Sequence, residues 1–212
     1  MRKYICFLLL ISIWLLTYPV TASLPLLGKI IVVDVGHGGK DPGTVFGDIY
    51  EKDINLKISL ELEKELSKFG ATVLLTREGD YDLSSANAIW RKKSDFDNRI
   101  KFINESRADL YLSIHLNYLQ DAFYNGIQVF GTKEHLEFAK IVQNNLNKNL
   151  NSNRDAKLIP RDTYMYNKLN PKGVLIESGF LSNVKERNLL ITREYQKKVA
   201  KEIATSVTKI IF

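Results

Sequence analysis

Two histidines and a glutamate occupy positions in this sequence that suit metal-dependent hydrolysis. His37 lies in VVDVGHGG, between glycines that directly follow the β-branched run Lys29–Val35. His115 ends the apolar run Asp109–His115 (DLYLSIH), and Glu177 directly follows the apolar residues VLI. Glycines beside a histidine let the backbone turn sharply and let another group approach closely. Because the chain has three histidines in total, two of them at the ends of apolar runs indicate a shared site.

A metal held by His37 and His115 needs a further ligand, and an acid is expected. Glu51 opens a predicted helix over 51–69 and shares one face of it with the apolar residues at 54, 58 and 62, so it points inward. Asp53 lies about 200° away from Glu51 around the helix and favours the flank. Two histidines and one carboxylate, with a fourth position for water, are typical of a catalytic zinc site. Glu177 is then free to act as general base.

Each of these residues also has an ordinary structural explanation. A single histidine at a strand end is more often structural than a ligand, and Glu51 suits the first turn of any helix because of the helix dipole. Glu177 could merely cap the turn that follows it. Taken together on neighbouring strand ends, the residues favour a metal site. We expect His135, in KEHLEF, to be solvated on a surface helix, and Arg77, in LTR, to be a structural ion-pair partner.

The elements that must position these side chains alternate between strands and helices. The predicted strands are 29–35, 71–76, 109–115, 126–130 (at an edge) and 174–177; the predicted helices are 51–69, 96–107, 133–150 and 194–211. This alternation predicts a single α/β domain with a twisted, mostly parallel sheet flanked by helices on both faces. Since the carboxyl ends of parallel strands share one edge, we expect the zinc site there.

The first 22 residues differ from the rest of the chain. Two basic residues, an apolar stretch over 4–18 and small residues before a cleavage site after Ala22 predict a secretory signal peptide. An uncleaved membrane anchor is the alternative, although a spanning helix needs about 20 apolar residues. Residues 23–28 are then a short linker and 29–212 the catalytic domain. The sequence therefore predicts an exported protein.

The cysteine content and the net charge limit which metal ligands and which binding partners are possible. Cys6 is the only cysteine, so the exported domain has no disulfide, and any metal site must use histidines and carboxylates. The formal net charge of +6 falls to +4 without the first 22 residues, and the charges are dispersed. A mildly basic exported protein suits an anionic surface such as a bacterial wall. We do not expect nucleic acid to be a partner.

Four motifs occur in series along the chain: VVDVGHGGKDPG, EKDINL, DLYLSIHLN and VLIESGFLSN. Together they resemble the zinc-dependent N-acetylmuramoyl-L-alanine amidases of bacterial cell walls, over essentially all of residues 29–211. YDLSS, RKKSDFDNR and the absence of a wall-binding repeat are most similar to the germination-specific (CwlD-type) amidases of spore-forming bacteria. The resemblance implies that His37, Glu51 and His115 hold one Zn²⁺ per chain and that Glu177 is catalytic. Val35 replaces a proline common in the family, and GTVFGDIY is unusually apolar.

The resemblance also implies a reaction and a setting. The reaction is hydrolysis of the amide bond between N-acetylmuramic acid and L-alanine in peptidoglycan. The setting is spore cortex maturation, in which a muramic-acid deacetylase acts next to form the muramic lactam needed for germination. The implied location is the cell wall or the intermembrane space of the developing spore. Because the small domain carries no binding module, we also expect an accessory protein at the membrane or the cortex.

Three residues are candidates for substrate contact. Asn117, two residues past His115, could orient a ligand or touch the substrate. The loop-rich segment 151–170 carries Arg161 and Tyr164 and is predicted to form one wall of an open groove for an anionic strand, although a variable loop is the ordinary explanation.

The sequence leaves two other functions open. One is another zinc peptidase on the same scaffold, which would need a charged clamp for a substrate terminus. The other is a non-catalytic wall-binding module. All four catalytic positions carry residues that can do the chemistry, and this argues against such a module.

Overall fold

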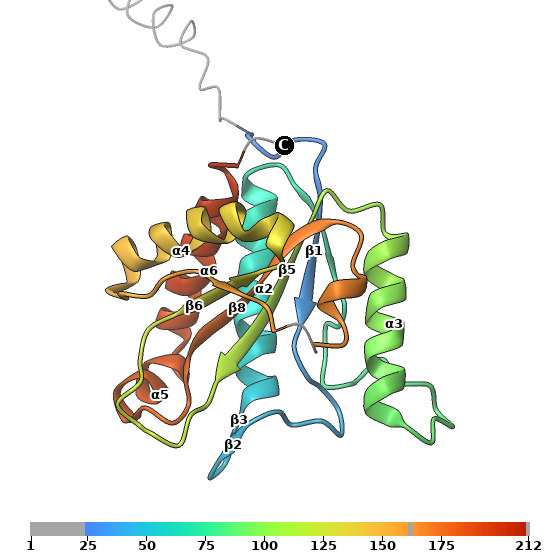
Figure 1. Ribbon diagram of the computed structural model, residues 1–212, viewed down its shortest axis with the longest axis horizontal. Coiled ribbons are helices and arrows are strands. Elements are labelled where there is room, and N and C mark those ends of the chain that lie inside the picture. The colour runs from blue at the N-terminus through green and yellow to red at the C-terminus, as the bar shows by residue number, and fades with distance from the viewer. Residues whose placement is uncertain (1–23, 161–162, 211–212) are drawn as a thin grey trace, which may run out of the picture.

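The apolar runs of the sequence form the strands of one sheet in the computed structural model, which describes residues 24–160 and 163–210. The strands are β1 (Ile30–Val35), β4 (Thr72–Leu75), β5 (Leu110–Asn117), β6 (Gln128–Gly131), β7 (Lys157–Leu158) and β8 (Lys172–Phe180). Their order across the sheet is β4-β1-β5-β8-β6-β7 (Figure 1). The pairs β4–β1, β1–β5 and β5–β8 are parallel, and β6 is antiparallel to β8. The predicted mostly parallel α/β domain is confirmed.

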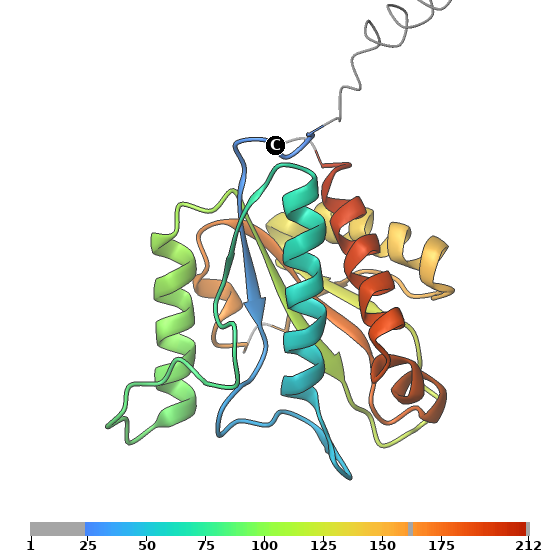
Figure 2. The same cartoon turned by 180° about the vertical axis from the view of Figure 1, so that it is seen from behind.

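Helices cover both faces of the sheet. On one face, α6 (Arg193–Val207) packs between α2 (Glu51–Lys68) and α4 (Leu136–Leu150) (Figure 2). On the other face lie α3 (Arg91–Glu105) and the segment that carries a short 3₁₀ turn, Tyr166–Lys168. A small hairpin of β2 (Val45–Phe46) and β3 (Ile49–Tyr50) precedes α2, and a one-turn 3₁₀ helix (Lys133–His135) precedes α4. The short helix α5 (Val184–Leu190) follows β8.

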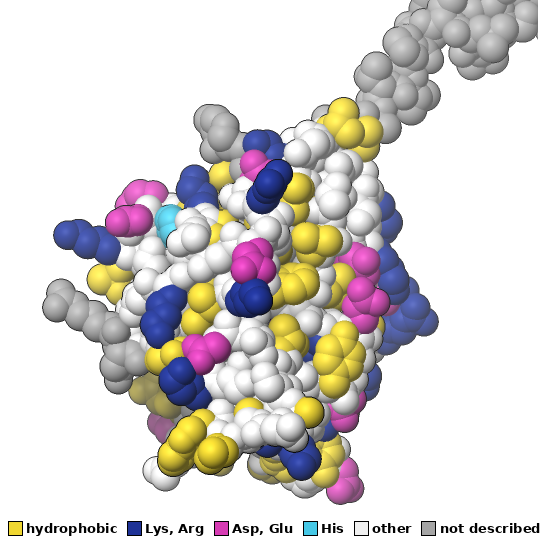
Figure 3. Space-filling model, turned by 90° about the vertical axis from the view of Figure 1, so that its right-hand side faces the viewer, with side chains coloured by type: hydrophobic (Ala, Val, Ile, Leu, Met, Phe, Trp, Pro, Cys, Tyr) yellow, Lys and Arg dark blue, Asp and Glu magenta, His cyan; other side chains and the backbone are white. Residues whose placement is uncertain are grey.

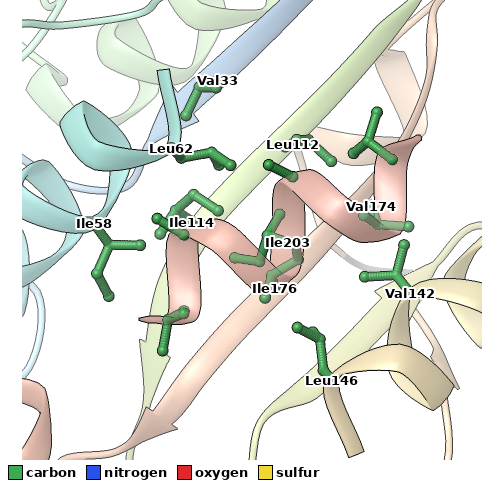
Figure 4. Packing of buried hydrophobic residues seen from close by; sticks show 14 of the residues in the cluster. Val33, Ile58, Leu62, Leu112, Ile114, Val142, Leu146, Val174, Ile176 and Ile203 are labelled. Carbon is green, nitrogen blue, oxygen red and sulfur yellow. The ribbon is translucent and has the colours of Figure 1, made fainter. Parts of the chain in front are cut away.

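The hydrophobic core lies mainly between the sheet and α2, α4 and α6. Figure 4 shows Ile203 of α6 lying against apolar side chains of β5 and β8, including Ile114 and Ile176, with further apolar residues from α2 and α4 around it. These side chains are fully buried. Burying an Ile or Leu side chain contributes about 1.5–3 kcal/mol, so this face fixes the strands relative to one another.

The other face of the sheet changes from apolar to polar along the strands. Because side chains alternate between faces with period two, residues next to the core positions point toward α3. Near the amino ends these are apolar, as with Val32 and Tyr111, which pack in a second cluster with Ile103 of α3. Toward the carboxyl ends they are polar: Asp34, Ser113, His115 and Glu177. The carboxyl edge on the α3 side is therefore where polar chemistry collects.

The structure differs from the sequence-based elements in several places. Helix α3 begins at Arg91, earlier than expected, and α5 was not expected. Strand β8 continues to Phe180, beyond the predicted end at Glu177, because Phe180 still pairs with Asn117 of β5 after a register irregularity. Strand β6 is not an edge, since β7, within the predicted loop 151–170, pairs with it.

The chain before β1 is also packed against the domain. Residues 24–28, within the predicted linker, form a turn in which Leu26 is buried and its N–H donates to the carbonyl of Phe69 at 3.0 Å. The predicted signal peptide or anchor at 1–22 lies outside the described residues. Within the described part of the chain, no helix combines the length and apolar character needed to cross a membrane.

Candidate metal centre

The structure brings His37, Glu51 and His115 together at the carboxyl edge of the sheet. They come from the loop after β1, the first turn of α2 and the last part of β5. Oε1 of Glu51 lies 3.1 Å from Nε2 of His37 and 3.2 Å from Nδ1 of His115. One ligand atom from each residue lies within 4.8 Å of the others. Ligands of a tetrahedral zinc, with bonds of about 2.0–2.1 Å, stand about 3.3 Å apart, so the set fits this metal.

Two glycines let the ligands approach one another this closely. A Cβ atom on Gly36 would stand 2.5 Å from Cε1 and Nε2 of His115. A Cβ on Gly43 would stand 2.7 Å from both Oε2 of Glu51 and Cδ2 of His37. His37 itself has a φ of 59°, in the left-handed region that non-glycine residues rarely adopt. The glycines of the first motif therefore make room for the ligand rings.

Polar groups around the cluster fix the orientation of the ligands. Nδ1 of His37 lies 3.0 Å from Oδ2 of Asp41, which leaves Nε2 free to face the centre. Oε2 of Glu51 accepts from the N–H of Thr44 at 2.8 Å, and Oε1 accepts from the N–H of Leu116 at 3.0 Å. A carboxylate behind a histidine is the usual way to set the orientation of a ligand ring. Sequence reasoning missed Asp41, although its position four residues after His37 in GKDPG was an available signal.

The electrostatics of the cluster favour a cation. Burial alone would lower the pKa of His37, but hydrogen bonds and charge from Asp41 and Glu51 raise that pKa to about 9. The hydrogen bond from His37 is the main cause that lowers the pKa of Asp41 to about 2. Burial alone would raise the pKa of Glu51, but His115 and His37 hold it well below its usual range. The site therefore stabilises positive charge between its ligands.

Glu177 faces the same cavity as the cluster. It lies opposite His115 in the β5–β8 register. The cavity has a volume of about 230 Å³, and Glu177, His37, His115 and Tyr166 are among the residues that line it. Oε2 of Glu177 is buried and has no hydrogen-bond partner among the described residues. Burial raises the pKa of Glu177 to about 7, with His115 lowering it and Glu51 raising it. A carboxylate with this pKa is matched to proton transfer near neutral pH.

The structure separates the three candidate substrate contacts. Tyr164 lines the cavity, and its hydroxyl donates to Oδ1 of Asp97 at 2.6 Å. Asn117 is the half-buried last residue of β5, beyond a register irregularity after His115, and is not among the residues that line the cavity. Arg161 lies outside the described residues. Basic, acidic and apolar side chains are interspersed on the face where α3 lies (Figure 3).

Two sequence-based expectations were wrong. Arg77 is structural, but no carboxylate of the described residues lies within ion-pair distance of it; its guanidinium donates to backbone carbonyls, among them that of His37 at 2.7 Å. The loop after β1 offers several carbonyl acceptors, which explains this choice. His135 is half-buried and not simply solvated, since it lies in the 3₁₀ turn before α4. Burial lowers its pKa.

Comparison with known proteins identifies the family. Residues 31–209 match the family model for N-acetylmuramoyl-L-alanine amidase. The chain is 42% identical over 194 residues to the germination-specific N-acetylmuramoyl-L-alanine amidase of Bacillus subtilis (strain 168), covering 88% of this chain and 81% of that protein. Its fold is similar to the CwlD amidase from Clostridioides difficile in complex with the GerS lipoprotein, with a TM-score of 0.81, 37% identity and coverage of 86% of this chain and 98% of that chain.

A second solved structure supports the same assignment. The catalytic domain of CwlV, an N-acetylmuramoyl-L-alanine amidase from Bacillus (Paenibacillus) polymyxa var. colistinus, has a TM-score of 0.75 and 28% identity, over 85% of this chain and 97% of that chain. The family model covers most of the chain, and these similarities extend over nearly all of the described domain. The chain therefore belongs to the N-acetylmuramoyl-L-alanine amidase family and is a peptidoglycan amidase.

Proposed function

We propose that the chain is a zinc-dependent amidase of the spore cortex, with one Zn²⁺ held by His37, Glu51 and His115 and with Glu177 as catalytic base. Three observations support the zinc. The family is generally zinc-dependent, the three side chains offer converging ligand atoms, and their spacing suits a tetrahedral metal. Two neutral imidazoles and one carboxylate leave a net positive charge on a divalent ion.

The observation that carries the catalytic assignment is the buried Oε2 of Glu177, which has no hydrogen-bond partner within the part of the chain that the structure describes. A buried carboxylate oxygen without a partner is costly unless a ligand or substrate satisfies it. It lines the cavity that also contains His37 and His115, so a substrate held by the cluster would lie beside it. Its raised pKa allows it both to accept and to donate a proton near pH 7.

The proposed chemistry divides the work between the metal and the chain. A zinc ion held by His37, Glu51 and His115 would polarise the scissile carbonyl and lower the pKa of the attacking water. Glu177 accepts a proton from that water as it attacks the carbonyl carbon of the lactyl group. Glu177 then delivers the proton to the nitrogen of L-alanine as the amide bond breaks. Because an amine anion is a poor leaving group, this second transfer matters as much as the first.

The substrate is proposed to lie along the cavity on the α3 side. Tyr164 lines this cavity, and the ammonium of Lys168 lies 3.4 Å from the centroid of the Tyr164 ring. An aromatic ring beside a cation suits a sugar and peptide strand that carries carboxylates. We also propose Arg161 and Asn117 as contacts farther along the strand. The segment 151–170 would then form one wall of the groove.

The proposed setting is the wall of the developing spore. The 42% identical Bacillus subtilis relative is named as germination-specific, and the Clostridioides difficile structure is a complex with a lipoprotein. We infer that this chain is exported through its first 22 residues, as a cleaved signal peptide or an anchor, and acts between the spore membranes or in the cell wall. An accessory lipoprotein-like partner would hold it there. A muramic-acid deacetylase would act on its product during cortex maturation.

The first test is the reaction itself. The purified protein is incubated with peptidoglycan and zinc, and mass spectrometry measures released stem peptide with a new L-alanine amino terminus. We expect chelator-sensitive release, a loss of about 10²–10⁴-fold in rate for Glu177→Gln and unchanged zinc content in that variant. Release by Glu177→Gln at the wild-type rate would refute the assignment of the base.

Two controls separate the proposed reaction from the alternatives. Faster turnover of free stem peptide than of intact muropeptide would indicate a peptidase on the same scaffold. Wall binding that survives chelation, without any product, would indicate a non-catalytic wall-binding module.

A further inference from the structure

Two buried arginines converge on the backbone of the loop that carries His37. Arg77 and Arg99 are 1% and 2% exposed, respectively. They come from the end of β4 and from the middle of α3, so they approach the loop from different elements. Between them they donate to the carbonyls of three consecutive residues, 35, 36 and 37. Neither guanidinium bonds to the side chain of a ligand.

The carbonyl of His37 receives the strongest support. Nε of Arg77 and Nη2 of Arg99 each donate to it at 2.7 Å. The carbonyl of Val35 accepts from Nη1 of Arg99 at 2.6 Å, and the carbonyl of Gly36 accepts from Nη2 of Arg77 at 3.0 Å. Hydrogen bonds from charged donors are about twice as strong as neutral ones. The two side chains therefore hold the peptide groups on both sides of Cα of His37.

This support matters because the backbone of His37 is strained. Its φ of 59° lies in the left-handed region, which is unfavourable for a residue with a Cβ atom. Beyond it, Gly38 and Gly39 also have positive φ, so a stretch of three residues leaves the strand conformation. Such a loop keeps one conformation only where its surroundings determine it. The imidazole ring takes its position from this backbone and from Asp41.

The two arginines differ in charge balance. Arg99 is paired with Asp34 at 2.8 Å and with Asp95 at 2.8 Å, so its loss would leave two buried carboxylates without their ion-pair partner. Arg77 has no carboxylate within ion-pair distance among the described residues, and its other acceptors are the carbonyls of Lys52 and Gly79. Burial lowers the pKa of Arg77 to about 10, which leaves it charged at neutral pH. Arg77 can therefore be substituted without creating an unpaired buried acid.

We propose that Arg77, together with Arg99, is a positioning residue for the metal centre, which presets the strained His37 loop for zinc before zinc binds. This inference rests on the proposed zinc site. A ligand set must hold its bond lengths within about 0.2 Å, so a loop released from these donors loses affinity even when all three ligands are present. Substituting groups that orient ligands costs about 10- to 100-fold in metal affinity.

The test compares Arg77→Lys and Arg77→Met with matched variants of Arg187. Arg187 is also buried, also has no ion-pair partner in the described part of the chain, and also donates to a backbone carbonyl, that of Leu181 at 2.7 Å. It does not touch the His37 loop. Zinc affinity is measured by competition with a chromophoric chelator at a temperature at which circular dichroism shows each variant folded. Thermal midpoints are measured with and without zinc.

We expect both Arg77 variants to bind zinc about 10- to 100-fold more weakly and to gain less thermal stability from zinc than the wild type does. The Arg187 variants should lose thermal stability but keep wild-type zinc affinity. Arg77→Lys keeps the charge and one donor nitrogen but not the planar fork of donors, so it serves as the folded variant if Arg77→Met is too unstable.

Wild-type zinc affinity in folded Arg77→Lys would overturn the inference, as would an equal loss of affinity in Arg187→Lys. Absence of zinc binding by the wild type would instead overturn the proposed function.

Discussion

Substitution of Gly36 by alanine should damage the metal centre while leaving the fold in place. The new Cβ would lie 2.5 Å from Cε1 and Nε2 of His115 and 2.6 Å from the carbonyl oxygen of Ile114. Ordinary van der Waals contact begins near 3.4 Å, so the imidazole must move by about 0.9 Å. This displacement is several times larger than the tolerance on zinc bond lengths, which is about 0.2 Å.

The expected loss for Gly36→Ala is on the order of 100-fold in zinc affinity, the upper end of what misplacing a ligand costs. Overpacking of this kind also costs about 1–3 kcal/mol in the free energy of unfolding. For a domain of this size each kcal/mol lowers Tm by about 2–4 °C, so the protein should stay folded at 25 °C. Amidase activity at a fixed, limiting zinc concentration should fall with the affinity.

Chelator competition and thermal unfolding of the apo protein measure the two effects separately. Gly79→Ala is the matched control, because a Cβ there would lie 3.4 Å from the Tyr81 ring, within ordinary contact, and it should keep wild-type zinc affinity. Zinc affinity of Gly36→Ala within twofold of the wild type would refute the close-approach argument. It would show that His115 moves freely without loss of the site.

Three further predictions follow from the same geometry. Asp41→Ala removes the carboxylate 3.0 Å from Nδ1 of His37, so chelator competition should show zinc affinity about 10-fold lower; unchanged affinity would contradict the orienting role. Burial alone would raise the pKa of Asp34, but Arg99, Ser113 and His115 together outweigh it, and the pKa is lowered. The stabilisation that the ionised Asp34 gives to the fold is therefore full above about pH 4 and is lost as pH falls further. Urea unfolding of Asp34→Asn should therefore show a loss of about 3–5 kcal/mol at pH 7 that shrinks below pH 4; a pH-independent loss would contradict it. Tyr164→Ala should raise KM for muropeptide about fivefold, equivalent to about 1 kcal/mol, because Tyr164 lines the cavity. The control variant Tyr124→Ala, at an exposed tyrosine outside the cavity, should leave KM unchanged. Equal KM values for the two variants would contradict a substrate contact at Tyr164.

The sequence alone determined the five longer strands, most helices and the identities of the clustered residues. These depend on local patterns: the nearly continuous apolar run over Ile30–Val35 indicates a strand buried on both faces, and the helical spacing from Glu51 onward specifies which side chains of the helix point inward. The helical spacing favours Glu51 over Asp53 as the inward-pointing acid, and the structure buries Glu51 and leaves Asp53 at the flank. The rule that parallel strands end at one edge then brought His37 and His115 together.

Only the tertiary structure decided how the site is held. The extension of β8 past Glu177 depends on the pairing of Phe180 with Asn117 of β5 across a register irregularity, which no local pattern encodes. Three acceptors of Arg77, the carbonyls of Val35, Gly36 and His37, lie 40 to 42 residues away in sequence. Only the packing of β1 beside β4 brings them to the guanidinium. A buried arginine takes whichever acceptor its surroundings offer, whether carboxylate or carbonyl, because both satisfy its donors. Residue type predicted that Arg77 would be structural, but only the three-dimensional arrangement showed that it supports the backbone beside His37.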